Sequence, residues 1–200
     1  MAVRIQTRPE PSWELKGPEY FNFAADVIDR WAKTQPDVTG LWCVNAATAA
    51  EQKFTFRELS RLSVQAANVF RSAGVRRGDR VLIMLPRVPQ WWIAMLGLIR
   101  LGAVPVPGTL LLTARDVAYR IQAAKISAVI ATTDGVAKLD GFDGVRLAVG
   151  EAPACWIDFD AKLRAADTRF LSAGFTTTWT MATRATKSVT GATTHFFRTC

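Results

Sequence analysis

The chain has 200 residues, of which 50% are hydrophobic and 10% aromatic, a composition that predicts a folded domain with a sizeable core. Its formal net charge of +8 comes from 25 Lys and Arg against 17 Asp and Glu. Because the cations are spread singly and form no run interleaved with aromatic residues, no nucleic-acid partner is expected.

Cysteine and histidine usage limits the chemistry that the chain can carry. Cys43, Cys155 and Cys200 lie far apart, and His195 is the only histidine. A zinc site or a Cys-His nucleophile is therefore not expected, because the partner ligand or base is missing. We interpret the cysteines as buried, reduced thiols of a cytoplasmic protein.

Residues 1–20 are predicted to be an irregular leading segment, without the apolar stretch of a signal peptide. Asn22 is then expected to cap a helix from Phe23 to about Thr34, which Pro36 ends. One apolar stripe of this helix is formed by Phe23, Val27, Ile28 and Trp31.

A hairpin and a long helix are predicted next. Short strands at 41–44 and 53–55 flank an Ala-rich turn. Thr55 and Glu58 have the spacing of a capping box, in which each side chain accepts a hydrogen bond from the backbone of the other residue. The helix that they begin should run to Ala73 and end at Gly74.

The pattern from residue 80 onward is that of alternating strands and helices. Arg80–Leu85 is a continuous apolar run, typical of a parallel strand that is covered on both faces. A helix should follow from Pro89 to Leu101, where Gly102 stops it. Further strands are expected at 104–106, 127–132 and 146–149, with helices at about 114–125 and 135–139. This alternation predicts a doubly wound, parallel-rich α/β sheet with helices on its faces.

Residues 91–114 are apolar enough to need a check for a membrane span, since they contain one charge, Arg100. A spanning helix needs about 20 apolar residues. Gly102, Pro105 and Pro107 interrupt the run, and a cation in mid-bilayer is costly. A buried helix followed by a buried strand is the better interpretation, so no membrane span is predicted.

Three segments together resemble the AMP-forming acyl-CoA synthetases of the adenylating superfamily, and in particular their medium-chain group. Residues 54–59 (FTFREL) match the first core motif, and residues 99–107 (IRLGAVPVP) are similar to the second. Between them, GDRV at 78–81 and LPRVPQWW at 85–92 follow the medium-chain pattern. The resemblance covers about residues 20–149.

The resemblance implies a fold and a reaction. Members of this family join a carboxylic acid, here a fatty acid, to ATP with Mg²⁺, and then transfer the acyl group to coenzyme A. The chain is expected to be the N-terminal part of the large domain, incomplete, ending before the ATP-binding loop and inactive alone. The family's Ser/Thr-Gly-Thr-Thr-Gly-x-Pro-Lys loop has only a poor counterpart at residues 188–194. ATP, Mg²⁺ and coenzyme A are therefore not expected to bind well to this chain.

No catalytic, cofactor-binding or metal-binding residue is assigned. Glu58, Gly102 and Pro107 belong to scaffold motifs. Trp91 and Trp92 could line an acyl pocket, but tryptophans on an amphipathic helix are more often core residues.

Several polar positions are also set aside. Asp158 and Asp160 are interpreted as caps of a helix that ends near Arg164. Leu111 stands where some family members have a polar residue near coenzyme A, so that contact is not carried over. His195 has no acidic neighbour in the sequence.

Residues 169–200 differ from the rest. Thr occupies 10 of the last 30 positions, and no acidic residue follows Asp167. We interpret this tail as disordered or read out of frame. The second interpretation is based on codons, because Thr and Ala codons of a GC-rich gene become Asp and Gly codons when read two bases later. The resemblance implies an acidic linker at this point. The domains are accordingly 1–20, 21–168 and 169–200.

A second function remains open. Instead of a truncated synthetase, the chain could be a non-enzymatic binding or regulatory module that associates with a full-length synthetase. An incomplete sheet exposes a strand edge and apolar surface, which favours self-association or pairing with another chain.

Overall fold

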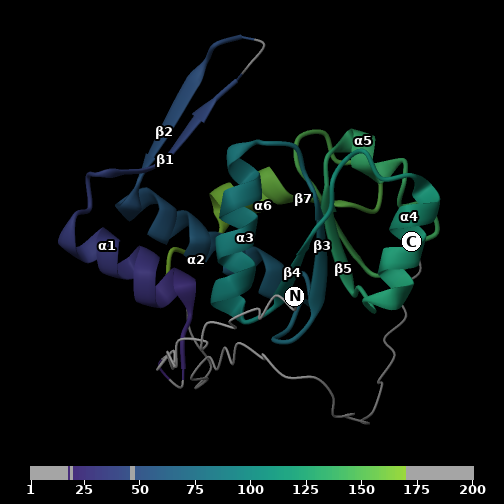
Figure 1. Cartoon of the computed structure of the whole chain (residues 1–200), viewed down its shortest axis with the longest axis horizontal. Helices are drawn as coiled ribbons and strands as arrows, with labels where there is room; N and C mark the ends of the chain where they lie inside the picture. The colour runs from purple at the N-terminus through teal and green to yellow at the C-terminus, as the bar shows by residue number, and fades with distance from the viewer. Residues whose placement is uncertain (1–17, 19, 46–47, 170–200) are drawn as a thin grey trace, which may run out of the picture.

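The computed structural model describes residues 18, 20–45 and 48–169 (Figure 1). In chain order, the elements of this part are η1 (Phe23–Ile28), α1 (Asp29–Thr34), β1 (Thr39–Val44), β2 (Glu51–Thr55), α2 (Phe56–Ser72), β3 (Arg80–Met84), α3 (Pro89–Leu101), β4 (Val104–Pro107), α4 (Ala114–Ala123), β5 (Ala128–Ala131), α5 (Thr133–Val136), β6 (Val145–Ala148), β7 (Ile157–Asp158) and α6 (Phe159–Ala165).

The central sheet confirms the predicted α/β class. Its five strands have the order β4-β3-β5-β6-β7, and every pair is parallel. From β3 the chain passes through α3 to β4 on one side, and α4 then returns it to β5 on the other. Connections that diverge in this way create a crevice at the carboxyl ends of the strands, where open α/β sheets bind ligands. The two-residue strand β7 was not predicted.

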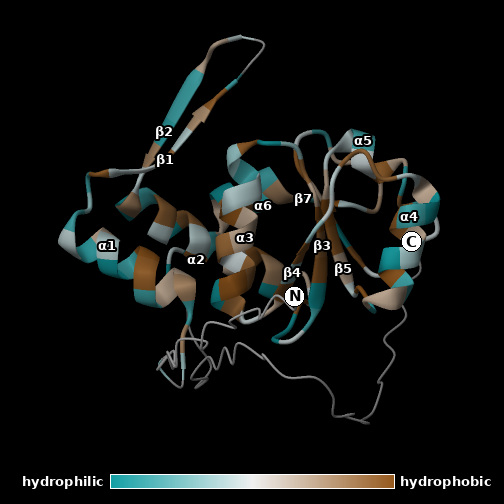
Figure 2. Cartoon of the chain, viewed as in Figure 1, coloured by the Kyte–Doolittle hydropathy of each residue, from teal (hydrophilic) through white to brown (hydrophobic). Residues whose placement is uncertain are grey.

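Helices cover both faces of this sheet, because β3 is apolar on both sides (Figures 1 and 2). Val81 and Ile83 belong to a core shared with α2, α3 and α6. Leu82 and Met84 belong to a second core, to which α4 contributes Val117. All four strand residues are fully buried. The unbroken apolar run therefore indicated a strand with two covered faces.

The predicted starts of α2 and α4 and the predicted end of α3 are confirmed, whereas the helix expected at 135–139 lies at Thr133–Val136. The backbone N–H of Thr55 donates to Glu58 Oε2 at 2.8 Å, and the N–H of Glu58 donates to Thr55 Oγ1 at 3.2 Å. Thr113 and Asp116 form a second capping box at α4. Gly102 ends α3 in the left-handed conformation, with φ of 78°, which glycine adopts at no steric cost.

The helices α2 and α3 cross at closely packed small residues. A Cβ atom on Gly97 would lie 2.5 Å from the Cβ of Ala66 and 2.9 Å from the backbone nitrogen of Ala67. Only glycine allows this approach, so the sequence of α3 fixes how close the two helices lie.

The first predicted helix is present, but its apolar stripe is wrong. Asn22 caps it as expected, yet the first six residues form the π-helix η1 before α1 begins. The wider π-turn moves side chains off the 3.6-residue period on which the stripe was based. Ala24 and Ile28 are buried, whereas Phe23 and Trp31 are 43% and 41% exposed.

A buried ion pair attaches this N-terminal segment to α3. Arg100 is 8% exposed, and its Nη2 and Nη1 donate to the two carboxylate oxygens of Asp29 at 2.6 and 2.9 Å. Its remaining donors reach Ser63 Oγ and the carbonyl oxygen of Ala24. Ser60 Oγ also donates to Asp29, at 2.6 Å. The cation that argued against a membrane span is thus fully partnered, as a buried charge must be.

Neither of the two described cysteines is buried, which corrects the prediction for them. Cys43 is partly exposed on β1, and Cys155 is exposed in the turn before β7. Cys155 has a φ of 64°, so it occupies a turn position in the left-handed region and not a packed site. Cys200 lies outside the described residues. In the part of the chain that the structure describes, no helix has the length and apolarity needed to cross a bilayer.

We predict that Asp29→Asn lowers the free energy of unfolding by about 2 to 3 kcal/mol, because it leaves the Arg100 charge buried without a counterion. The 26% exposure of the Asp29 side chain keeps the effect below that of a fully enclosed pair. Denaturant unfolding at neutral pH measures it. The control is Asp37→Asn, which breaks an exposed pair with Arg57 and should change stability by less than about 0.5 kcal/mol. Equal effects would contradict the prediction.

The same pair gives a dependence on pH. Burial raises the pKa of Asp29, but hydrogen bonds from Arg100 and Ser60 outweigh it, so the pKa lies below its ordinary value. The stabilisation is therefore complete above the unfolded-state pKa of about 3.9 and is lost as the pH falls through the folded-state pKa. The stability difference between the wild type and Asp29→Asn should shrink in that acidic range.

Candidate functional site

An open cleft of about 800 Å³ lies beside the carboxyl ends of β3 and β4. One wall is the hairpin of β1 and β2, which projects from the body of the molecule (Figure 1). The other walls are the N-terminal turn of α3 and the loops that follow β3 and β4. We call this feature the hairpin cleft; its lining residues are Trp42, Cys43, Val44, Leu85, Pro86, Arg87, Trp91, Trp92, Pro107, Gly108, Thr109 and Leu110.

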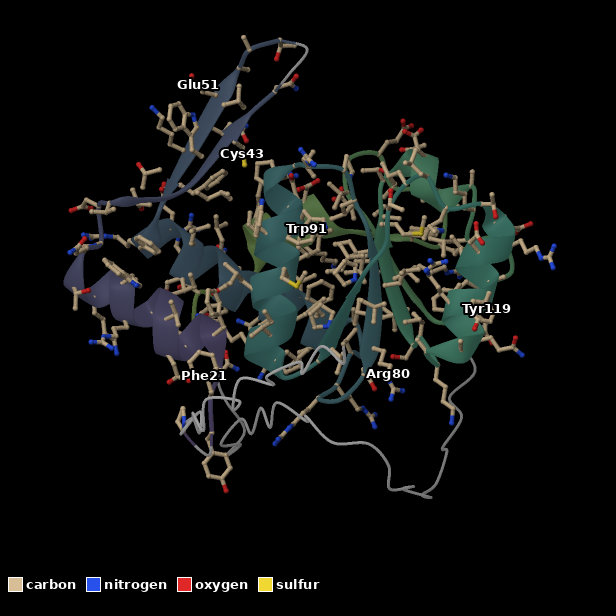
Figure 3. All side chains as sticks on the ribbon, viewed as in Figure 1. Phe21, Cys43, Glu51, Arg80, Trp91 and Tyr119 are labelled. Carbon is tan, nitrogen blue, oxygen red and sulfur yellow. The ribbon has the colours of Figure 1, made fainter. Side chains whose placement is uncertain are left out.

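The two tryptophans of α3 differ in their surroundings. Trp91 is partly buried and packs against the core that α2, α3 and α6 share with the sheet, which confirms its interpretation as a core residue. Trp92 is 48% exposed, so the same interpretation is wrong for it. The rings meet edge to face, with centroids 4.6 Å apart. Consecutive residues on a helix point about 100° apart, and only one of them can face the sheet. Figure 3 shows Cys43 on the side of the hairpin nearer to α3.

The loop after β4 forms the floor of the cleft. The backbone N–H of Gly108 donates to the carbonyl oxygen of Ile83 at 2.9 Å, which continues the pairing of β4 with β3. A Cβ on Gly108 would lie 3.2 Å from Leu82 Cδ1, so a larger residue would crowd the core. Lys138 Nζ donates to the carbonyl oxygen of Leu110. Leu111 is 90% exposed and does not line the cleft.

The cleft is suited to apolar contacts and offers little for catalysis. Arg87 is its only ionisable side chain apart from the Cys43 thiol, whose pKa burial raises. A raised pKa keeps a thiol protonated and therefore weakly nucleophilic. Within the described residues, no group of three or more His, Cys, Asp and Glu side chains could hold a metal ion.

The remaining polar candidates have structural partners. Asp158 caps α6 as predicted, by accepting a hydrogen bond from the N–H of Ala161 at 2.8 Å. The prediction that Asp160 is also a cap is wrong. Its carboxylate accepts hydrogen bonds from the Gln90 side chain and from the N–H of Gly150, both at 3.0 Å, and so ties α3 to the loop after β6. His195 and residues 188–194 lie outside the described residues.

Comparison with known proteins identifies the family. The family model described as AMP-binding enzyme matches residues 28–173. The chain belongs to the AMP-binding enzyme family. Among curated relatives, the rat protein named acyl-coenzyme A synthetase ACSM2, mitochondrial, is 42% identical over an alignment of 161 residues that covers 74% of this chain and 28% of the rat protein. Human ACSM2B is 40% identical over 166 residues, covering 76% of this chain and 28% of the human one.

Solved structures of acyl-CoA synthetases support the fold. A Brucella canis acyl-CoA synthetase matches with a TM-score of 0.70 at 24% identity, over 78% of this chain and 30% of its own. An acetoacetyl-CoA synthetase from Streptomyces lividans matches with a TM-score of 0.66 at 28% identity, over 74% of this chain and 26% of its own. The chain thus spans less than a third of the length of these relatives, as the resemblance of its motifs predicted.

The two tryptophans of the cleft allow a direct test of their different roles. Trp91→Ala should lower the free energy of unfolding by about 2 to 3 kcal/mol, because it removes a partly buried ring from the core. Trp92→Ala should cost less than about 1 kcal/mol, because half of its ring is already in water. Urea unfolding followed by circular dichroism compares them. A larger loss for Trp92→Ala would show that the cleft is closed in solution.

Proposed function

We propose that residues 21–168 are the N-terminal α/β part of the large domain of a medium-chain acyl-CoA synthetase. In its whole length, such an enzyme would join a fatty acid to coenzyme A with cleavage of ATP to AMP and pyrophosphate, in the presence of Mg²⁺. The observation that carries this proposal is the identity of about 40% to acyl-coenzyme A synthetases across three quarters of the chain.

The described part supplies scaffold, and we assign it no catalytic, cofactor-binding or metal-binding residue. Adenylate formation needs backbone N–H groups that surround the phosphates and a lysine that stabilises the developing charge. The hairpin cleft has apolar walls and the single cation Arg87. Residues 188–194 contain one glycine and no following Pro-Lys pair. ATP and coenzyme A should therefore bind poorly to the 200-residue polypeptide.

The purified 200-residue polypeptide should give ATP–pyrophosphate exchange no faster than a buffer control with medium-chain fatty acids and Mg²⁺, because it lacks the phosphate-binding loop. A full-length relative such as human ACSM2B provides the positive control. Exchange that depends on both enzyme and fatty acid would overturn the assignment of this chain as scaffold.

The alternative is a non-enzymatic module that associates with a synthetase. Trp42 and Val44, 56% and 58% exposed on a strand with one unpaired edge, are the observation that favours it. Capture of an intact synthetase by the tagged chain, without any gain in exchange activity, would support this module. If the tagged chain captures a synthetase only when that synthetase lacks the matching region, the result would support the first proposal.

We divide the chain into three parts, 1–20, 21–168 and 169–200. The last part, residues 169–200, is proposed to be read out of frame. The family match ends at residue 173, close to where acidic residues cease. Resequencing the gene past the codon for Phe170 should show another frame that encodes an acidic linker and then a Ser-Gly-Thr-Thr-Gly run. Absence of such a run from both other frames would rule this out.

A cytoplasmic location is also a proposal. Among the described residues, Cys43 and Cys155 form no disulfide with each other, which is compatible with a reducing compartment such as the cytoplasm. The rat and human relatives carry the word mitochondrial in their names. Cell fractionation with an antibody to the chain distinguishes the two locations.

A further inference from the structure

The hairpin cleft exposes aromatic surface that the core of the fold does not use. Trp92 is 48% exposed on α3, and Trp42 is 56% exposed on the hairpin. Trp91 continues this surface, because its ring meets that of Trp92 edge to face with the centroids 4.6 Å apart. Exposed apolar surface of this kind marks binding sites, since a ligand that covers it removes the surface from contact with water.

Of the described residues that line the cleft, Arg87 alone is charged. Its side chain is exposed, and within the described part of the chain it makes no hydrogen bond or ion pair. Asp160 is hydrogen-bonded to Gln90, three residues after Arg87, but Asp160 is not part of the lining. The Arg87 cation is therefore available to an anion from solution, and no described carboxylate in the lining repels that anion.

The rest of the lining suits an alkyl chain. The volume of about 800 Å³ lies in the range of about 300 to 1,000 Å³ that is typical of small-molecule sites. Pro107 and Leu110 continue the apolar wall beside the end of β4, and the polar residues Cys43 and Thr109 carry no charge. An alkyl chain needs no hydrogen-bond partner along its length, so it is covered by such walls without leaving a polar group unpaired.

We propose that the hairpin cleft binds a single-chain amphiphile with one anionic head group. The head group pairs with Arg87, and the alkyl chain lies against Trp92 and Trp91. A carboxylate suits this role, because its two oxygens match two parallel N–H donors of a guanidinium. The site takes no part in adenylate formation, so this proposal goes beyond the proposed function and does not depend on it.

The openness of the cleft limits the expected affinity. A fully buried methylene group would strengthen binding by about fourfold, and a chain that is covered mainly on one side should gain about half of that factor. We therefore expect about twofold for each added methylene group, and a Kd on the order of 0.1 to 1 mM for decanoate.

Equilibrium dialysis of the 200-residue chain with labelled decanoate, below its micelle concentration, tests the site. One molecule should bind to each chain, and the affinity should rise from octanoate to dodecanoate. Trp92→Ala should weaken the binding of decanoate by about fivefold or more, because it removes a ring that the alkyl chain covers. The matched control is Trp31→Ala, which removes a tryptophan that is 41% exposed on α1 and does not line the cleft. It should change the affinity by less than about twofold.

Comparison of decanoate with uncharged decanol isolates the head group. Arg87→Gln should weaken the binding of decanoate by about threefold to tenfold and change that of decanol by less than about twofold, because only the carboxylate pairs with the guanidinium. Arg76→Gln removes another exposed arginine, which precedes β3 and so lies at the other end of that strand from the cleft. It should affect neither ligand. Circular dichroism verifies that each variant remains folded.

The remaining outcomes also decide. Decyl sulfate should bind with the same dependence on Arg87, since it has one negative charge on the same tail. The proposal is overturned if decanoate shows no saturable binding about tenfold above the expected Kd, or if neither Arg87→Gln nor Trp92→Ala weakens it. It is also wrong if the chain binds neutral phosphatidylcholine vesicles through Trp92 but not monomeric decanoate, because the cleft then contacts a lipid surface. A dimer of the chain that Trp92→Ala dissociates would identify a second copy as the occupant instead.

Discussion

The ion pair between Arg100 and Asp29 determines how the N-terminal segment sits on the rest of the structure. A guanidinium that is 8% exposed cannot remain without partners, because its desolvation costs several kcal/mol. Asp29, Ser63 and the carbonyl oxygen of Ala24 together satisfy it, and two of these three lie in η1 and α1. The segment is thereby held against α2 and α3. Since β1 follows α1 after a short turn and β2 runs directly into α2, the position of these helices against α3 also sets where the hairpin lies.

Much of the fold could be predicted because its signals are local. A capping box, as at Thr55 and Glu58, depends only on residues three apart. Gly102 ends a helix through its own φ, and the run Arg80–Leu85 has to be covered on both faces wherever it lies. The α/β class and the parallel sheet follow from such features. None of them requires knowledge of which other segment will be in contact.

Most of the predictions that failed concern exposure, which is a property of tertiary structure; the cap assigned to Asp160 failed because its carboxylate binds Gln90 and Gly150 instead. The stripe of Phe23 and Trp31 assumed 3.6 residues per turn, and no local signal announced the π-helix. Trp92 and Cys155 were interpreted as buried because their residue types usually are. Whether a particular side chain is covered depends on what lies above it, as with Trp92 at the mouth of an open cleft. The hairpin cleft itself joins segments more than 40 positions apart, so no sequence window contains it.

The outer edges of the described sheets differ in whether they could pair with a further strand. Pro105 and Pro107 alternate outward on β4, and charged side chains line the outer edge of β2. These features cost the fold little stability, because neither removes a hydrogen bond that the sheet makes. Their effect is to prevent pairing with a further strand. The outer edge of β1 has no such feature, although a single Lys in place of Val44 would have supplied one. Among the described strand edges, the outer edge of β1 is therefore the one at which the sequence leaves further pairing open.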